Sequence, residues 1–378
     1  MPSRFAILVV LFLLGLLHAL IGMLLIPVLA PIPLLPALLG CWLLLSFLLI
    51  PAGLLARAIQ SQPLSDRLAW AGMLAMGIFS SLLLATLLRE LCLWMLPWFK
   101  LNHDQFSLWS AVAVLLLTVV SSLMGYFNAR RLAAVVEVDI PISGLPAALH
   151  GYTIVQISDI HVGPTIKHSY LDAIVNKVNT LEPDLIAVTG DLVDGSVQEL
   201  AAHTAPLANL RSRHGAYFVT GNHEYYSNAP EWVTEVRRLG LTVLMNQHVI
   251  INHQGASLLV AGVTDYSAHH FDEAQRSDPH AALAGGPQHV ALKLLLAHQP
   301  RSAAAAADAG FDLQLSGHTH GGQFFPWNLF VPLQQPYTAG LNRLRNLWVY
   351  TSRGTGYWGP PKRLFAPSEI TRLRLVLA

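Results

Sequence analysis

Residues 313–323 read LQLSGHTHGGQ, a short apolar run that ends in two histidines surrounded by glycines. The leucines alternate with polar residues, as they do in a β-strand, and the glycines permit the sharp turn that follows it. His318 and His320 are separated by one residue, so in an extended segment their rings point to the same side. On its own the pair fits either a functional site or an ordinary polar loop. The other motifs of the sequence distinguish these two interpretations.

From about residue 132 onwards, apolar runs of strand length alternate with helical stretches. This alternation predicts an α/β domain, and its strand-rich later half predicts a two-sheet β-sandwich flanked by helices. Helices are expected near residues 168–181, 197–213 and 230–239. Strands are expected at AAVVEVDI, YTIVQIS, DLIAVTG, AYFVTG, LTVLMN, HVIINH, SLLVAGV, ALKLLLAH, DLQLSGH, LWVYTS and EITRLRLVL.

Polar side chains follow five of these strands. In open α/β sheets, sites form where loops at the carboxyl ends of several strands converge. Each group alone has a plain structural explanation, because Gly, Asp and Asn favour turns. Five groups in succession favour one shared site. They are Asp159 and His161 in DIH, Asp191 and Asp194 in GDLVD, Asn222, His223 and Glu224 in GNHE, the single His298, and His318 with His320 in GHTH.

These residue types predict a metal centre. Imidazole and carboxylate together suit Mn, Fe, Zn or similar divalent ions. The two cysteines, Cys41 and Cys92, both lie in the apolar first third, so thiolate ligands are absent from the predicted site. Together these side chains are enough to coordinate two metal ions incompletely. Two ions about 3.5–4 Å apart can bind one phosphoester between them.

The first third of the chain has the composition of a membrane region. The chain is 53% hydrophobic and 12% charged, whereas soluble domains average about 25% charged residues. Runs of about 18 or more apolar residues are long enough to span a bilayer, and the first run exceeds the roughly 7–15 apolar residues of a signal peptide. We therefore expect a four-helix transmembrane region over 1–128 and the α/β domain over 129–378. The runs are Phe5–Leu29, Ala37–Ala56, Ala69–Leu88 and Leu108–Phe127.

The distribution of Lys and Arg predicts the orientation, since the richer side of a membrane protein is cytoplasmic. With four spans the α/β domain lies on the richer side, and we expect it in the cytoplasm. The net charge of +1 gives no indication of a nucleic-acid partner. One side holds Arg4, Arg57, Arg67, Arg130 and Arg131, and the other holds Arg89 and Lys100.

The motif set DIH, GDLVD, GNHE, a single His and GHTH resembles the calcineurin-like metallophosphoesterase superfamily. The fuller GHTHGGQ and SRGTGYWGPPKR resemble its bacterial branch, in which membrane segments precede the phosphoesterase domain. The resemblance covers about residues 133–378 and implies definite roles. Asp159, His161 and His320 would bind one metal ion, Asn222, His298 and His318 the other, and Asp191 would bridge both.

The resemblance also implies how the remaining residues act. His223 would contact the substrate phosphate or protonate the leaving oxygen, and Asp194 would orient His223 or cap its loop. Arg353 would contact phosphate or serve as an ordinary strand-end arginine, and Glu224 is expected to be structural. A hydroxide bridging the two ions would attack phosphorus in line.

The implied function is a metal-dependent phosphodiesterase or phosphomonoesterase in the bacterial inner membrane. Four spans beside the site suggest a lipid-linked or membrane-proximal phosphoester, and no obligate protein partner is expected. The alternative is a catalytically silent membrane sensor or scaffold that keeps the fold. The complete set of ligand positions argues against that alternative.

Overall fold

The computed structural model describes residues 4–59, 61–96, 103–287 and 289–378, so Lys100 lies outside the described residues. The chain divides into two compact units. One comprises Met1–Phe127 with Gly359–Lys362, and the other comprises Asn128–Trp358 with Arg363–Ala378. Each unit is described below by itself.

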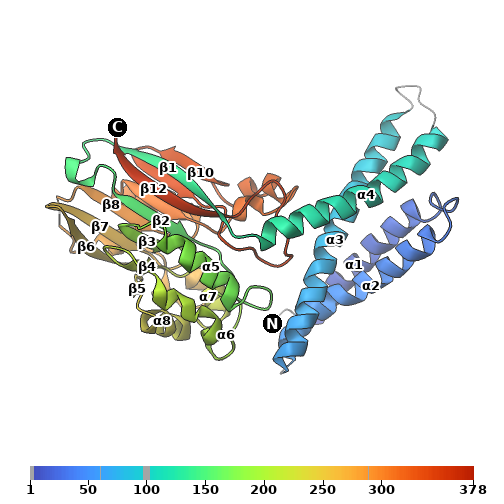
Figure 1. Ribbon diagram of the computed structural model, residues 1–378, viewed down its shortest axis with the longest axis horizontal. Helices are drawn as coiled ribbons and strands as arrows, with labels where there is room; N and C mark the ends of the chain where they lie inside the picture. The colour runs from blue at the N-terminus through green and yellow to red at the C-terminus, as the bar shows by residue number, and fades with distance from the viewer. Residues whose placement is uncertain (1–3, 60, 97–102, 288) are drawn as a thin grey trace. The chain divides into compact units, whose positions relative to one another are not determined.

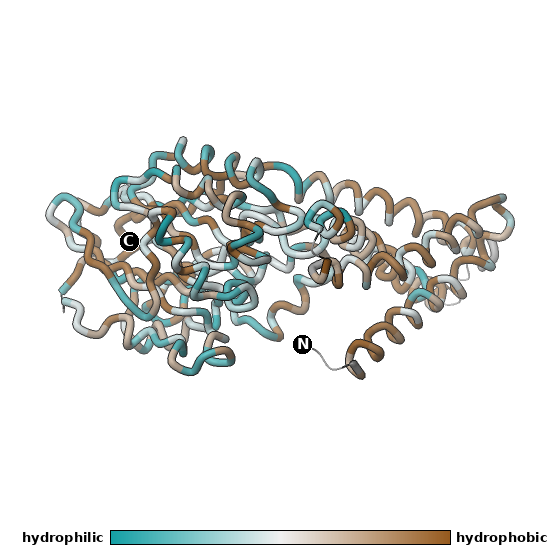
Figure 2. The backbone as a smooth tube through the Cα atoms, turned by 90° about the horizontal axis from the view of Figure 1, so that it is seen from below, coloured by the Kyte–Doolittle hydropathy of each residue, from teal (hydrophilic) through white to brown (hydrophobic). Residues whose placement is uncertain are grey.

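The first unit is built from long apolar helices, which appear brown in the hydropathy view of Figure 2. Within the described residues, four helices are long and apolar enough to span a membrane, which confirms the predicted four apolar helices. Gly53 and Gly72 pack so closely that a Cβ on either would lie within 2.7 Å of the other's Cα, as is usual where small residues join membrane helices. The helices are α1 (Arg4–Leu25), α2 (Leu35–Leu55), α3 (Gln62–Met95) and α4 (His103–Arg130).

The second unit contains two six-stranded sheets among its described residues, ordered β1-β12-β2-β3-β4-β5 and β10-β11-β9-β8-β7-β6 (Figure 1). Strands β2 to β5 are parallel to one another, as are β7, β8, β9 and β11. The strands are β1 (Ala134–Ile142), β2 (Thr153–Ile157), β3 (Leu185–Val188), β4 (Ala216–Phe218), β5 (Thr242–Val243), β6 (Gln247–His253), β7 (Ala256–Gly262), β8 (Leu292–Leu296), β9 (Leu313–Ser316), β10 (Gly340–Leu344), β11 (Leu347–Thr351) and β12 (Glu369–Leu377).

Three apolar cores hold this unit together in four layers. Side chains such as Ile154 and Leu294 fill the space between the two sheets. The first sheet packs its other face on helices that contribute residues such as Ile174 and Trp232, and the second sheet packs on short helices through Ala306. The predicted β-sandwich flanked by helices is therefore confirmed. The helices are α5 (His168–Asn179), α6 (Val197–Thr204), α7 (Asn222–Tyr226), α8 (Ala229–Arg238), α9 (Pro279–Leu283) and α10 (Ala303–Ala309).

Several elements differ from the sequence prediction, since α7 and α9 were not predicted and two further elements also depart from it. The helix expected over 197–213 ends at Thr204 and continues as a 3₁₀ turn over Ala205–Asn209. Pro206 explains the change, because a proline lacks the amide that a regular helix would use there. Strand β10 was not predicted, since its sequence GLNRL has little apolar character.

Candidate metal centre

The predicted site residues all follow strands that run in parallel within each sheet. The loops after β2, β3 and β4 come from the first sheet, and those after β8 and β9 come from the second. Direct contacts join the two sets. The Nε2 of His298 lies 3.1 Å from a carboxylate oxygen of Asp191, and the amide of His318 donates to Asp159 at 2.9 Å. The two sheets therefore bring their loops to one centre.

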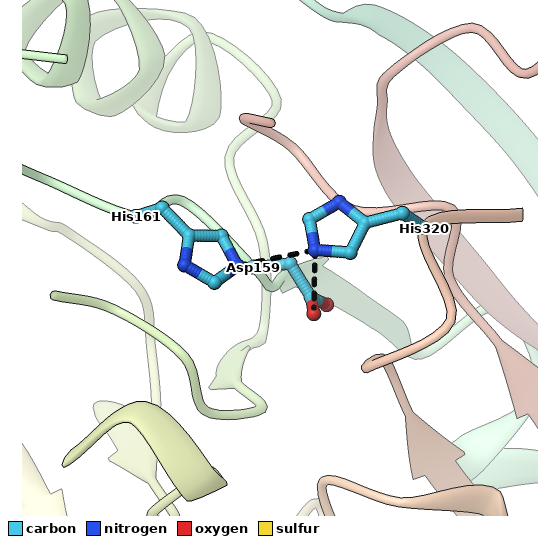
Figure 3. A group of neighbouring side chains, drawn as sticks. All are labelled: Asp159, His161 and His320. Atoms are coloured by element: carbon cyan, nitrogen blue, oxygen red, sulfur yellow. Dashed lines mark hydrogen bonds and ion pairs between the residues drawn. The ribbon is translucent and has the colours of Figure 1, made fainter. Parts of the chain in front are cut away.

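Asp159, His161 and His320 form the first cluster of possible ligands (Figure 3). The Nε2 atoms of His161 and His320 lie 3.1 Å apart, and the Nε2 of His320 lies 3.4 Å from Asp159 Oδ1. The three side chains are buried and point their donor atoms toward one another. One cation can be held by such a set of two imidazoles and one carboxylate.

Asp191, His298 and His318 form the second cluster. The Nδ1 of His298 lies 2.7 Å from the carbonyl oxygen of Thr189. A carbonyl only accepts hydrogen bonds, so this nitrogen carries the hydrogen and Nε2 of the neutral ring is an acceptor. That acceptor faces the Asp191 carboxylate at 3.1 Å and the His318 Nδ1 at 3.3 Å. With the His298 ring neutral, its Nε2 and the Asp191 carboxylate oxygen are two facing acceptors, and they require a proton or a cation between them.

A further buried oxygen has no partner within the described residues. The Oδ1 of Asn222 is buried and makes no hydrogen bond, although buried polar atoms are normally paired. Its neighbour His223 donates its amide to Asp191 Oδ1 at 2.9 Å, which ties Asn222 to the second cluster. The unpaired oxygen and the facing acceptors together fit the coordination of divalent cations.

The protonation of two of the histidines also fits metal binding, which requires neutral imidazole. Burial lowers the pKa of His318 to about 3 and lowers the pKa of His320 well below its usual range. Both rings are therefore neutral at pH 7. His298 differs, because burial lowers its pKa but the Asp191 carboxylate outweighs burial and raises the pKa well above its usual range. Burial raises the pKa of Asp159, despite the opposing influence of His298.

The carboxylate of Asp194 contacts two histidines of this centre. Its Oδ1 lies 2.5 Å from Nδ1 of His223 and 3.3 Å from Nδ1 of His161. Burial would raise the pKa of Asp194, but the two histidines hold it well below its usual range. As an ionised acceptor, Asp194 keeps hydrogen on both Nδ1 atoms. These two contacts hold both rings in a fixed orientation.

His223 lies at the edge of the centre, and its side chain is 13% exposed. Its Nε2 is 3.9 Å from Asp191 Oδ2, too far for a hydrogen bond. Burial lowers the pKa of His223, but Asp191 and Asp194 outweigh it and raise the pKa to about 9. The ring is thus protonated at neutral pH in the absence of bound metal.

Five of the seven predicted ligands have left-handed backbone conformations. For residues other than glycine this conformation costs roughly 1–2 kcal/mol each, and such strain is concentrated at functional sites. The conformation turns the chain sharply immediately after a strand, so two side chains of one loop can face the same point. The residues and their φ angles are Asp159 (52°), His161 (56°), Asp191 (50°), His318 (71°) and His320 (51°).

Glu224 joins two of the ligand loops. Its fully buried carboxylate accepts from the backbone amides of Asp191 at 3.0 Å, Leu192 at 2.8 Å and Gly221 at 2.6 Å. Burial, with the charge of Asp191, raises the pKa of Glu224 to about 7. The side chain thus connects GDLVD to GNHE, in line with its expected structural role.

Two arginines, Arg353 and Arg363, come from the segment SRGTGYWGPPKR. The Nε of Arg353 donates to Glu369 at 2.7 Å, so its charge is already paired. Arg363 is almost fully buried and donates from Nη2 to Nδ1 of His320 at 3.1 Å. Sequence reasoning missed this contact. The only signal was the position of Arg363 at the end of SRGTGYWGPPKR.

Comparison with known proteins agrees with this geometry. Residues 152–322 match the family model described as calcineurin-like phosphoesterase. A bovine transmembrane protein with metallophosphoesterase domain is 42% identical over 71% of this chain and 62% of its own length. An uncharacterized metallophosphoesterase of Helicobacter pylori is 40% identical over 59% of each chain.

A third relative is matched over most of its length. An uncharacterized metallophosphoesterase of Bacillus subtilis is 30% identical over 65% of this chain and 88% of its own. By contrast, the chain spans about three fifths of the length of the cattle and zebrafish relatives. The match to the family model and the extent of these similarities show that the chain belongs to the calcineurin-like metallophosphoesterase family.

Proposed function

We propose that this protein is a membrane-anchored, metal-dependent hydrolase of phosphoesters. The observation that carries the proposal is the pair of Asp–His clusters, the second of which contains Asp191, with the unpaired oxygen of Asn222. The four apolar helices supply the anchor. The substrate proposed is a phosphomonoester or phosphodiester, with a lipid-linked ester as the preferred class.

The proposed ligand sets follow the two clusters. Asp159, His161 and His320 would hold one divalent ion, and Asn222, His298 and His318 would hold the second, with Asp191 shared. Mn, Fe and Zn all suit imidazole with carboxylate, and we propose manganese for the first assays. When bound, the two ions would neutralise the phosphate and acidify a water molecule.

The chain's own residues would complete the reaction. During hydrolysis the water oxygen bonds to phosphorus, the bond from phosphorus to the leaving oxygen breaks, and that oxygen needs a proton. His223 would supply it from Nε2, because Asp194 holds the Nδ1 hydrogen at 2.5 Å. General acid catalysis of this kind contributes about 10²–10⁴-fold in rate. Arg353 would orient the phosphate from the β11 side.

We place the catalytic unit on the cytoplasmic side of the bacterial inner membrane. The distribution of basic residues in the sequence supports this side, with Arg4, Arg57, Arg67, Arg130 and Arg131 against Arg89 and Lys100. Protease access to a tag after Ala378 in sealed inverted vesicles and in intact cells tests the assignment. A tag cleaved in intact cells would reverse it.

Hydrolysis assays test the activity. The full-length protein, purified and stripped of metal, would be incubated with p-nitrophenyl phosphate or bis-p-nitrophenyl phosphate, with and without Mn²⁺. We expect metal-dependent release of p-nitrophenol that Asp191→Asn abolishes and His223→Ala slows about 10²–10⁴-fold. Ser212→Ala, on an exposed loop outside the site, serves as the control. Absence of hydrolysis with every metal and substrate tried would favour the silent sensor or scaffold.

A further inference from the structure

The segment that follows GHTHGGQ is unusually apolar for an exposed loop. Residues 324–333 read FFPWNLFVPL and contain no charged residue. Five of their large side chains are exposed, although contiguous exposed apolar patches on soluble domains usually mark an interaction site. They are Phe325 (37%), Trp327 (50%), Leu329 (61%), Phe330 (52%) and Leu333 (79%).

Two other exposed aromatic residues are joined to this segment. Phe324 forms β-bridges with Leu364 and Phe365, and the Phe365 side chain is 83% exposed. Gln323 exchanges two hydrogen bonds of 2.8 Å with the backbone of Trp358, which is 53% exposed. We call residues 324–333 with Trp358 and Phe365 the apolar rim.

The apolar rim is attached directly to the metal centre. A Cβ on Gly322 would lie 2.2 Å from the Cα of Asn328, so the rim packs tightly on the GHTHGG loop. At its other end, the Trp358 ring lies 5.5 Å from the ring of His223. Whatever covers the rim therefore lies next to the side chain proposed to protonate the leaving group.

The residues around the rim indicate what kind of partner would bind it. From residue 313 to residue 368 the sequence contains no Asp or Glu. Of its five Lys and Arg residues, Lys362 and Arg363 are buried, and Arg345 and Arg353 pair with Asp308 and Glu369. Arg301, beyond this stretch, contacts the rim's border by donating to the carbonyl of Gln334. An uncharged apolar surface that carries tryptophan suits the lipid–water interface, where tryptophan is favoured.

The connection between α4 and β1 is short, so the catalytic unit cannot lie far from the end of an apolar helix. Helix α4 is apolar enough to span a bilayer and ends at Arg130, and strand β1 begins at Ala134. Three intervening residues extend at most about 14 Å. The catalytic unit is thus tethered close to a bilayer surface, which favours lipid over a separate soluble partner.

We propose that the apolar rim inserts into the interface of a lipid bilayer and opens the metal centre toward phosphoesters embedded in that bilayer. The insertion is independent of the proposed hydrolase activity. Only the second part, the choice of substrate, rests on the proposed function.

The insertion is tested in the full-length protein in liposomes of phosphatidylcholine and phosphatidylglycerol. Cys41 and Cys92 are replaced by serine, and an environment-sensitive fluorophore is placed on Leu333→Cys. Ile250→Cys, on β6 and 39% exposed, is the matched apolar control. We expect a blue shift and quenching by spin-labelled lipid at 333 and neither at 250.

Two results would overturn the insertion. A fluorophore at 333 that stays in a polar environment places the rim in water. A blue shift without quenching by spin-labelled lipid places the rim against protein, either another part of the chain or a second copy.

The substrate part has a separate readout. In the Leu329→Ser/Phe330→Ser variant, we expect the ratio of hydrolysis of a bilayer-embedded phosphoester to that of bis-p-nitrophenyl phosphate to fall about tenfold. An unchanged ratio would refute this part. If the parent protein hydrolyses neither substrate, the proposed function fails, and the quenching experiment still decides the insertion.

Discussion

Replacing Glu224 with Gln tests whether one buried carboxylate holds the metal loops together. In the parent protein its two oxygens accept three backbone amides, from Asp191, Leu192 and Gly221. Glutamine offers one acceptor oxygen and turns an NH₂ group toward at least one of these amides. The variant therefore loses a hydrogen bond and gains a contact between two donors.

The size of the effect follows from these contacts. A lost hydrogen bond to a charged group costs about 1.5–3 kcal/mol, and an unsatisfied buried donor costs about 1–3 kcal/mol. Removing a buried charge offsets part of this, since the pKa of Glu224 is raised to about 7. We expect a net loss of about 2–4 kcal/mol in the free energy of unfolding. For a unit of this size the loss lowers Tm by roughly 4–16 °C.

A matched control is available within the same unit. Glu199 occupies the same third helical position as Glu224 and likewise accepts the amide of the residue before its helix, but it is exposed and accepts that amide, from Ser196, at 3.1 Å. Glu199→Gln should cost no more than about 1 kcal/mol. Tm is measured at pH 8, where Glu224 is ionised, and hydrogen exchange is followed at Asp191 and Leu192.

Equal changes in Tm for the two variants would refute this reasoning. So would unchanged exchange at the amides of Asp191 and Leu192 in Glu224→Gln, because those amides would then have another acceptor.

Three further predictions concern the metal centre. His223→Ala should lower kcat about 10²–10⁴-fold while Tm changes little; a kcat within threefold of the parent's would remove His223 from the reaction. Asp194→Asn should move the alkaline limit of kcat to lower pH, because Asp194 helps raise the pKa of His223 to about 9 and so keeps it protonated; an unmoved limb in the pH–rate profile contradicts this. Removing divalent ions with a chelator should abolish hydrolysis and lower Tm, with recovery on adding Mn²⁺, because ions at a hundredfold excess over Kd stabilise by about 2.7 kcal/mol; a chelator-insensitive Tm would mean that no such ions are bound.

The positions of the candidate ligands could be predicted because they depend on local sequence. An apolar strand followed directly by Asp or His places that residue at the carboxyl edge of a sheet, whatever the strand order. Asp159 and His318 were found in this way, and their loops do meet, through the amide of His318. Their left-handed backbone could not be predicted, because Asp and His have no strong preference for it.

Other features depend on contacts between distant segments. The role of Glu224 could not be predicted from the sequence. Its carboxylate oxygens accept hydrogen bonds from the amides of Asp191 and Leu192, which are more than thirty residues away. Arg363 reaches His320 across 43 residues. The insertion of β12 between β1 and β2 is likewise a matter of topology, and no periodicity in EITRLRLVL indicates which neighbours it takes.

The pairing of β1 with β12 has a consequence for how the protein is made. The two strands run parallel along their full length, from Ala134 beside Glu369 to Ile142 beside Leu377, and paired residues are 235 positions apart. A ribosome adding about 5–20 residues per second needs roughly 10–50 s to cover that distance. During that time β1 has no partner strand, because β12 is its only neighbour in the sheet order among the described residues. The nascent domain therefore has an unpaired strand edge until β12 has been synthesised.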